Sequence, residues 1–177
     1  MSRRPFVVDV VALRRRHGQR ERVEARGRLE GLVVTEAAVP EDAEVSVDVV
    51  LESVEGGIVA RGVVRAPWVG ECRRCLRALQ GEEEAEVEGV FVPVADAVEG
   101  DTWPIEHHQI DLEGMVREAA ALELPLAPLC RPDCAGLCPT CGADLNDGPC
   151  PCRAAMTDAR WEALDQLREG RADAEGL

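Results

Sequence analysis

The eight cysteines constrain this chain more than any other feature. Their spacing is C-x2-C, a long gap, and then C-x3-C-x3-C-x2-C-x8-C-x-C. Eight thiolates match the ligand requirement of two closed, tetrahedral zinc sites. Disulfides are the alternative, but no export signal accompanies them, and a reducing compartment favours metal ligands. We therefore expect eight zinc ligands: Cys72, Cys75, Cys130, Cys134, Cys138, Cys141, Cys150 and Cys152.

The strongest local motif is the run Cys138-Pro139-Thr140-Cys141-Gly142. In a zinc knuckle, one tight turn presents both thiolates, and a glycine after the second cysteine permits the positive φ that the turn needs. Cys150 and Cys152 lie close behind and complete a local set of four. Residues 130–152 have no apolar core of their own, so we expect metal binding to fold them.

The pairing of the remaining cysteines stays open at this point. In the first partition, the knuckle Cys72/Cys75 shares a zinc with the pair Cys130/Cys134. In the second partition, the two C-x2-C knuckles form a ribbon, and the other four cysteines bind the second zinc. The first partition needs fewer long-range loop closures, and we favour it for that reason.

Composition and patterning predict a cytoplasmic protein. Hydrophobic residues make up 46% of the chain but aromatic residues only 3%, so the core is expected to be aliphatic. No apolar run approaches the roughly 18 residues of a membrane span. The N-terminus does not resemble a secretory signal either, because Asp9 and the run Arg14–Arg16 interrupt it.

Charge is distributed unevenly along the chain. The formal net charge is −14, yet residues 1–30 hold nine arginines and only four acidic residues. Only this basic N-terminal arm supplies the footprint that nucleic-acid binding requires. The acidic remainder suits a basic protein partner.

Two arginine clusters are candidate nucleic-acid-binding residues, one in the arm and one at the first cysteine pair: Arg14, Arg15, Arg16, Arg73, Arg74 and Arg77. The second cluster has an alternative interpretation. A zinc ion held by four thiolates leaves a charge of −2, so nearby guanidinium groups are expected as electrostatic partners of the site.

The hydrophobic pattern predicts an α+β fold, with an antiparallel β-rich domain and one or two packed helices. We expect strands at 6–13, 45–51, 58–65 and 82–94, a hairpin turn at Gly56-Gly57, and a loop at 94–108. Asp111 is expected to cap a helix that runs to about Glu123, and a last helix is expected at 158–168. The predicted domains are the β-rich core at 1–128, including the arm and first strand at 1–30, and a zinc-stapled extension at 129–177.

The sequence offers no catalytic constellation, and we expect a protein that is not an enzyme. The three histidines, His17, His107 and His108, are not at ligand spacing from any cysteine pair. There is no glycine-rich phosphate loop and no nucleophile elbow, so no small-molecule substrate is expected.

The motif formed by Cys72, Arg74, Cys75 and Leu76 at the end of a strand resembles the bacterial YceD-like family, the large ribosomal RNA subunit accumulation proteins. The exit L-E-L-P-L at 122–126 and the motif C-x3-C-x-G-L-C-P-x-C-G-x2-L-N at 130–146 resemble the family's long, cysteine-rich form. The resemblance implies a link to large-subunit ribosomal RNA and no catalytic activity. Some family members keep the first knuckle and a position like Cys134 while losing the terminal pair, which also favours the first partition.

Two functional hypotheses follow. The first is a non-catalytic ribosome-biogenesis factor that contacts large-subunit ribosomal RNA, or its precursor, through the two arginine clusters. The second is an acidic adaptor with purely structural zinc, which escorts a basic ribosomal protein or regulates another protein. A weaker third hypothesis is a redox sensor that loses zinc on thiol oxidation.

Overall fold

The structure is a computed structural model that describes residues 4–152. The chain divides into two compact units, Met1–Pro132 and Asp133–Leu177. The second helix expected from the sequence, at 158–168, lies outside the described residues. Within the described part, no helix combines the length and the apolar character needed to cross a bilayer.

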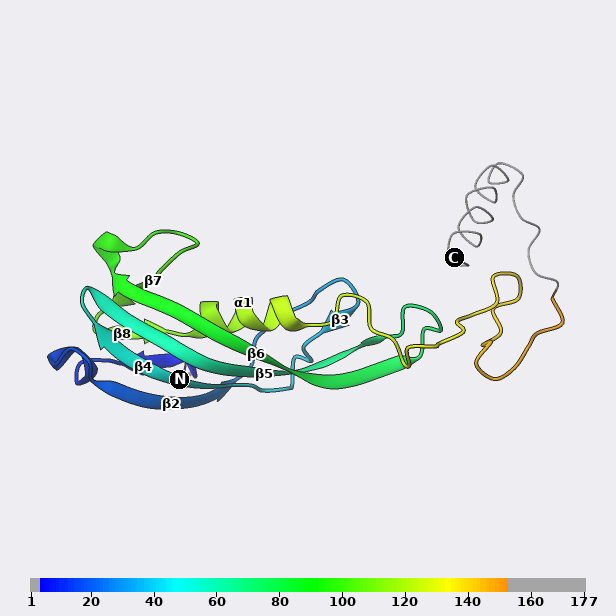
Figure 1. The fold of residues 1–177 in the computed structure, drawn as a ribbon, viewed down its shortest axis with the longest axis horizontal. Helices are drawn as coiled ribbons and strands as arrows, with labels where there is room; N and C mark the ends of the chain where they lie inside the picture. Colours follow the sequence, from blue (N-terminus) through cyan, green and yellow to red (C-terminus); the bar gives the residue numbers. More distant parts are fainter. Residues whose placement is uncertain (1–3, 153–177) are drawn as a thin grey trace, which may run out of the picture. The chain divides into compact units, whose positions relative to one another are not determined.

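The first unit is built on one sheet that curls into a half-barrel (Figure 1). The strand order is β1-β8-β7-β6-β5-β4-β2, with β3 paired to β5. Every paired neighbour is antiparallel except β6 and β7. The strands are β1 (Val7–Asp9), β2 (Arg20–Gly27), β3 (Ala37–Ala38), β4 (Val45–Val54), β5 (Gly57–Glu71), β6 (Ala78–Pro93), β7 (Trp103–Glu106) and β8 (Gln109–Asp111).

The long strands β4, β5 and β6 confirm the three central strands that the sequence predicts. Alternate residues of β4 from Val45 to Leu51 are buried, because a strand presents every second side chain to the core. The predicted turn before β5 is also present, and Gly56 adopts a φ of +84° there. A residue with a side chain would be strained at this φ.

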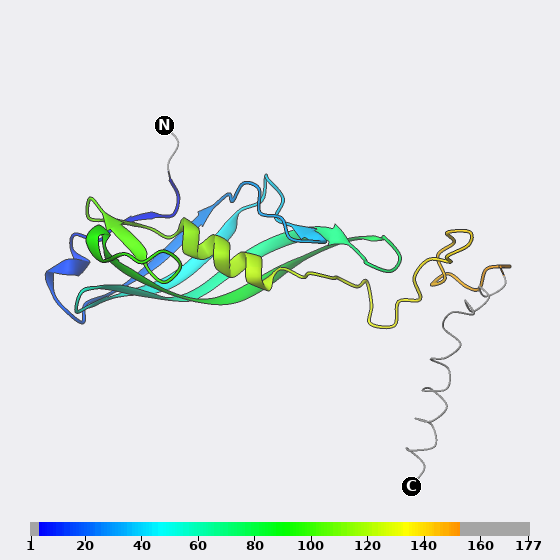
Figure 2. The same cartoon turned by 90° about the horizontal axis from the view of Figure 1, so that it is seen from above.

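One α-helix, α1 (Glu113–Glu123), packs on the same face of the sheet as the buried side chains of β4 (Figure 2). Its buried residues Met115, Val116, Ala119 and Ala120 form the stripe expected of an amphipathic helix. The N-cap residue is Leu112 and not Asp111 as predicted, but the Asp111 carboxylate, one residue earlier, accepts a hydrogen bond of 2.9 Å from the Glu113 amide.

The predicted α+β class is wrong. Strands make up 43% of the structure and helical segments 11%, and α1 is the one α-helix among residues 4–152. The apolar pattern of α1 is strong, but the helix is only 11 residues long and covers one sheet. The protein is therefore mostly β.

Two predicted segments also differ in detail. Only Val7–Asp9 of the expected strand at 6–13 pairs in the sheet. The last residue of the expected strand, Leu13, belongs instead to a 3-10 turn, η1 (Leu13–Arg15). The expected loop at 94–108 contains a second 3-10 turn, η2 (Val94–Asp96), and β7. Strands of three or four residues are too short for a period of two to reveal them.

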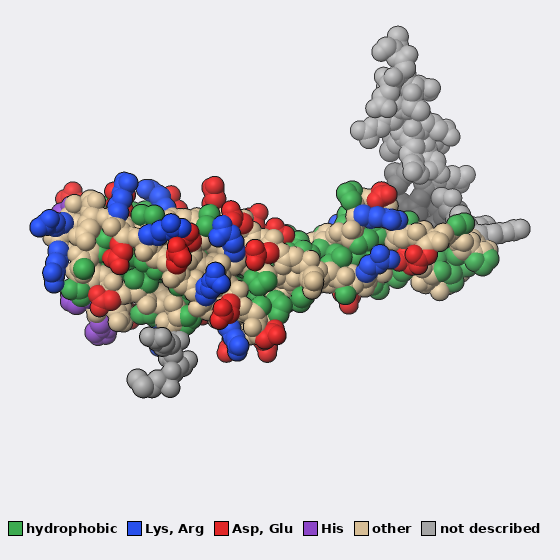
Figure 3. Space-filling view, turned by 90° about the horizontal axis from the view of Figure 1, so that it is seen from below, with side chains coloured by type: hydrophobic (Ala, Val, Ile, Leu, Met, Phe, Trp, Pro, Cys, Tyr) green, Lys and Arg blue, Asp and Glu red, His purple; other side chains and the backbone are tan. Residues whose placement is uncertain are grey.

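Much of the N-terminal arm is a strand of the sheet. Arg20 and Arg22 of β2 form ion pairs with Glu52 and Asp48 of the neighbouring strand β4. On the same face, Arg61 pairs with Glu88 at 2.9 Å. Figure 3 shows arginine and acidic side chains intermixed over this face. Two arginines of the basic arm are therefore paired with acidic residues of the neighbouring strand.

In the second unit, residues 133–152 form turns and one isolated bridge, between Leu137 and Asp144. Backbone hydrogen bonds, such as that from the Leu145 amide to the Gly136 carbonyl at 2.9 Å, join parts of this segment.

Candidate metal centres

The eight cysteines gather into two groups of four. The first group is Cys72, Cys75, Cys130 and Cys134, and the second group is Cys138, Cys141, Cys150 and Cys152. Within each group all sulfur atoms lie within 4.8 Å of one another, and all eight cysteines are free thiols. This grouping is the first of the two partitions that the sequence left open.

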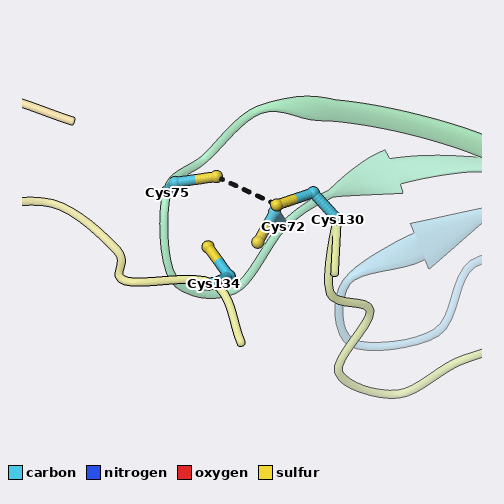
Figure 4. Close-up of side chains that lie close together, drawn as sticks. All are labelled: Cys72, Cys75, Cys130 and Cys134. Atoms are coloured by element: carbon cyan, nitrogen blue, oxygen red, sulfur yellow. Dashed lines mark hydrogen bonds between the residues drawn. The ribbon is translucent and has the colours of Figure 1, made fainter. Parts of the chain in front are cut away.

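The sulfur positions fit a tetrahedral thiolate site. A Zn–S bond of about 2.3 Å places tetrahedral sulfurs about 3.8 Å apart. The sulfurs of Cys75 and Cys130 are 3.6 Å apart, well beyond the roughly 2.05 Å of a disulfide. Figure 4 shows the four thiols of the first group converging on one point. Each group can therefore hold one metal ion with soft ligands.

The first knuckle is the turn that joins β5 to β6. Its Cys72 amide donates to the Arg77 carbonyl at 2.8 Å, and the Leu76 amide donates to the Cys72 carbonyl at 2.9 Å. Leu76 adopts a φ of +58° and is 59% exposed. A leucine therefore occupies a left-handed backbone position that favours glycine.

The second knuckle repeats this turn. The Cys138 amide donates to the Ala143 carbonyl and the Gly142 amide donates to the Cys138 carbonyl, both at 2.8 Å. Gly142 has a φ of +73° and is the counterpart of Leu76. The two C-x2-C motifs thus form the same backbone turn, with glycine in one and leucine in the other.

Backbone contacts bring Cys130 to the first knuckle. The Arg73 amide donates to the Pro128 carbonyl at 3.0 Å, and the Arg74 guanidinium donates to the Pro132 carbonyl at 3.4 Å. These two bonds fix the segment on either side of Cys130. Pro128 was not a candidate from the sequence, because a carbonyl acceptor leaves no signal in residue type.

Asn146 was also missed as a contributor to the site. Its side-chain amide donates to the Cys134 sulfur at 3.4 Å, and its carbonyl oxygen accepts from the Ala135 amide at 2.9 Å. Hydrogen bonds of this kind orient a thiolate ligand. In the sequence, Asn146 belongs to the family motif at 130–146, but nothing assigns it to a particular cysteine.

Cys72 carries an acidic thiol. Burial acts to raise its pKa, but the backbone amides of Cys130, Cys75 and Arg74 donate to the sulfur and lower the pKa to about 6. The thiolate form is therefore favoured near neutral pH, as a metal ligand requires.

The thiols of the second group influence one another's ionisation. The backbone amides of Cys141 and Thr140 lower the pKa of Cys138 to about 6. The pKa of Cys152 is raised to about 12, first through its hydrogen bond with the Cys141 thiol and then by burial. Successive thiols resist ionisation beside existing negative charge, and a divalent cation removes that resistance.

The two arginine clusters do not lie together. Arg14 and Arg15 belong to η1, and Arg16 follows it. This turn lies close to the start of β5, because the amide of Ser53, near the end of β4, donates to the Gln19 carbonyl at 2.9 Å. Cys72 follows the other end of β5, which at about 3.3 Å per residue is about 45 Å away. In Figure 3, basic side chains gather at the end of the unit that carries η1.

The first unit and the two cysteine groups define a class of protein: a curled, mostly antiparallel β-sheet with two C-x2-C knuckles, each completed by a further cysteine pair. The chain belongs to the family described as "Large ribosomal RNA subunit accumulation protein YceD", whose pattern matches residues 60–168.

Named relatives place the chain more closely. It is 35% identical to an uncharacterized protein of Mycobacterium tuberculosis over 178 residues, which cover 96% of this chain and 84% of the relative. It is 36% identical to an uncharacterized protein of Mycobacterium leprae, over 93% of this chain and 82% of the relative.

The chloroplastic "Large ribosomal RNA subunit accumulation protein YCED homolog 1" of Zea mays is 31% identical to this chain, with 62% of this chain and 48% of the relative covered. No solved structure matches the chain.

Proposed function

We propose that this chain is a non-catalytic factor that supports the accumulation of large-subunit ribosomal RNA and carries two structural zinc ions. Membership of the YceD family is the observation that carries the ribosomal part of this proposal. The plant relatives that share the family bear the same description in their names.

The donor sets support zinc as the metal. All four groups in each cluster are thiols, and Cys₄ sites of this kind are closed structural zinc sites without an open position for catalysis. Bound zinc would offset half of the negative charge of the four thiolates in each cluster and hold its two chain segments together. Cys72, Cys75, Cys130 and Cys134 would hold one ion, and Cys138, Cys141, Cys150 and Cys152 the other.

The arginine turn at η1 is the most favourable surface for RNA contact. Arg14, Arg15 and Arg16 are exposed, and none of them forms an ion pair within residues 4–152. Arg20 and Arg22, by contrast, are engaged with acidic residues of β4. An arginine without an ion pair can bind an RNA phosphate and release its counterion without first losing a contact within the protein.

The arginines of the first knuckle differ in their contacts. Arg73 is exposed, whereas Arg74 is bonded to the Pro132 carbonyl and its amide donates to Cys72. These bonds support a role for Arg74 in positioning the metal site, and leave Arg73 as the better candidate for phosphate contact.

The test is binding of the purified protein to large-subunit ribosomal RNA at several salt concentrations. The triple variant Arg14→Gln, Arg15→Gln and Arg16→Gln should bind more weakly and lower the slope of log K against log salt by about 2 to 3. The matched control changes Arg20, Arg22 and Arg61 to glutamine, which removes the same charge from ion-paired positions. Equal losses in both variants would show that net charge alone, and not the η1 turn, governs binding.

A cellular experiment tests the functional part. In a strain that lacks the gene, the wild-type chain should restore the ratio of large-subunit to small-subunit ribosomal RNA, and the Cys72→Ser and Cys138→Ser variants should fail. Normal ribosomal RNA in the deletion strain would contradict the proposal.

A further inference from the structure

One edge of the sheet is left open along β6. This strand pairs with β5 from Ala78 to Phe91, but β7 joins it only at Phe91–Pro93. Among the described residues, no strand pairs with the other edge of β6 before Phe91. Alternate backbone amides and carbonyls of this stretch point away from β5, and such an edge can accept a further strand.

A groove runs along this open edge. Five consecutive residues of β6, 86–90, form one wall. The groove is lined by the buried Val87 and also by the exposed Glu86 and Glu88, which point to the opposite face of the sheet. The groove therefore follows the edge of the strand and not one of its faces. At about 3.3 Å per residue, this wall is about 17 Å long, the length of a five-residue strand.

The opposite wall is helical. Met115, Glu118, Ala119 and Leu122 lie on one face of α1 and line the groove, and Trp103 closes one side. Figure 2 shows α1 running beside β6. Gly89 permits this approach, because a Cβ there would lie 2.4 Å from the Met115 sulfur. A space between a strand edge and a helix is the arrangement in which several domains bind an extended peptide as an added strand.

The groove is acidic and partly apolar. Its lining includes the acidic residues Glu86, Glu88, Asp101 and Glu118 and contains no arginine, lysine or histidine. Glu88 is paired with Arg61, but the other three form no ion pair in the described part of the chain. Leu122 is 79% exposed at the rim.

We propose that this groove binds an extended, basic segment of a partner protein by strand addition to β6. Backbone hydrogen bonds to residues 86–90 would supply the register. Basic side chains of the segment would meet Glu86, Asp101 and Glu118, and its apolar side chains would cover Leu122 and Trp103. RNA is excluded from this surface by its charge, so the site is separate from the η1 turn.

The test uses a blocked octapeptide of alternating arginine and valine and the full-length, isotope-labelled protein. Amide shifts in the NMR spectrum should concentrate at residues 86–90 and along α1. The same peptide with alternate N-methylated amides should bind at least tenfold more weakly, because it cannot complete the strand pairing. The same peptide with glutamate in place of arginine should not bind.

Two matched pairs of variants locate the site. Leu122→Gln should weaken peptide binding several-fold, whereas Leu126→Gln, at a residue that is 63% exposed outside the groove, should not. Glu118→Gln should weaken binding, whereas Glu123→Gln on the same helix should have little effect. Equal binding of the N-methylated peptide, shifts confined to another surface, or no binding at millimolar peptide would overturn the proposal. None of these outcomes bears on RNA binding at η1.

Discussion

The left-handed backbone at Leu76 provides a sharp test of the knuckle geometry. Leu76 has a φ of +58°, and its counterpart Gly142 has a φ of +73°. A non-glycine residue in this conformation loses about 1 to 2 kcal/mol relative to glycine. Glycine in turn loses about 0.5 to 1 kcal/mol through the greater freedom of the unfolded chain.

The informative comparison is Leu76→Ala against Leu76→Gly, because both remove the same side-chain contacts. We expect the glycine variant to be more stable than the alanine variant by about 0.7 kcal/mol, the difference between the midpoints of the two effects. Leu126 is a matched control, since it is also exposed and does not have a positive φ. There the order should reverse, with alanine more stable than glycine.

Thermal unfolding in reducing buffer measures this difference. For a unit of this size, 1 kcal/mol corresponds to a shift in Tm of about 3 to 5 °C. If Leu76→Ala is at least as stable as Leu76→Gly, the turn does not hold a left-handed residue, and the equivalence of the two knuckles fails.

Three further predictions concern the metal sites and the sheet. The reduced protein should contain two zinc ions, and Cys72→Ser and Cys138→Ser should each reduce the content to about one, as measured by elemental analysis. Zinc affinity should fall as the pH is lowered, and it should fall more steeply below about pH 6, where the thiolates of Cys72 and Cys138, whose pKa values are about 6, also take up protons. Competition with a chromogenic chelator measures this affinity, and an affinity that stays constant between neutral pH and about pH 5 would contradict the prediction. Gly62→Ala should lower the free energy of unfolding by about 1 to 3 kcal/mol, because its Cβ would lie 2.0 Å from the Asp48 carbonyl oxygen. The control Arg61→Ala, at the neighbouring residue, should lower it by less than about 1 kcal/mol. Chemical denaturation measures both values.

The local parts of the fold were predictable because their signals lie within a few residues. The alternation in β4, the Gly56 turn, and the stripe of α1 each reflect one element packing on one core. The C-P-T-C-G knuckle belongs to the same class, since its turn requires only a positive φ at Gly142. The α+β class was mistaken because the local pattern of α1 is strong, although this helix of 11 residues covers only one sheet. The short strands β7 and β8 also carry too few residues to show a period.

The sequence by itself therefore determined the knuckles, the long strands and the helix, since each depends on backbone geometry over a short span. Only the tertiary structure decided which cysteines meet. The first group joins residues more than fifty positions apart, as Cys75 and Cys130 do, and their meeting depends on where β5 ends and where the chain returns from α1. The tertiary structure also decided which charged side chains form ion pairs. Arg20 and Arg22 belong to a basic arm in the sequence, but strand register places them opposite Glu52 and Asp48 and leaves Arg14–Arg16 uncommitted. Register is a property of the whole sheet, and no local pattern encodes it.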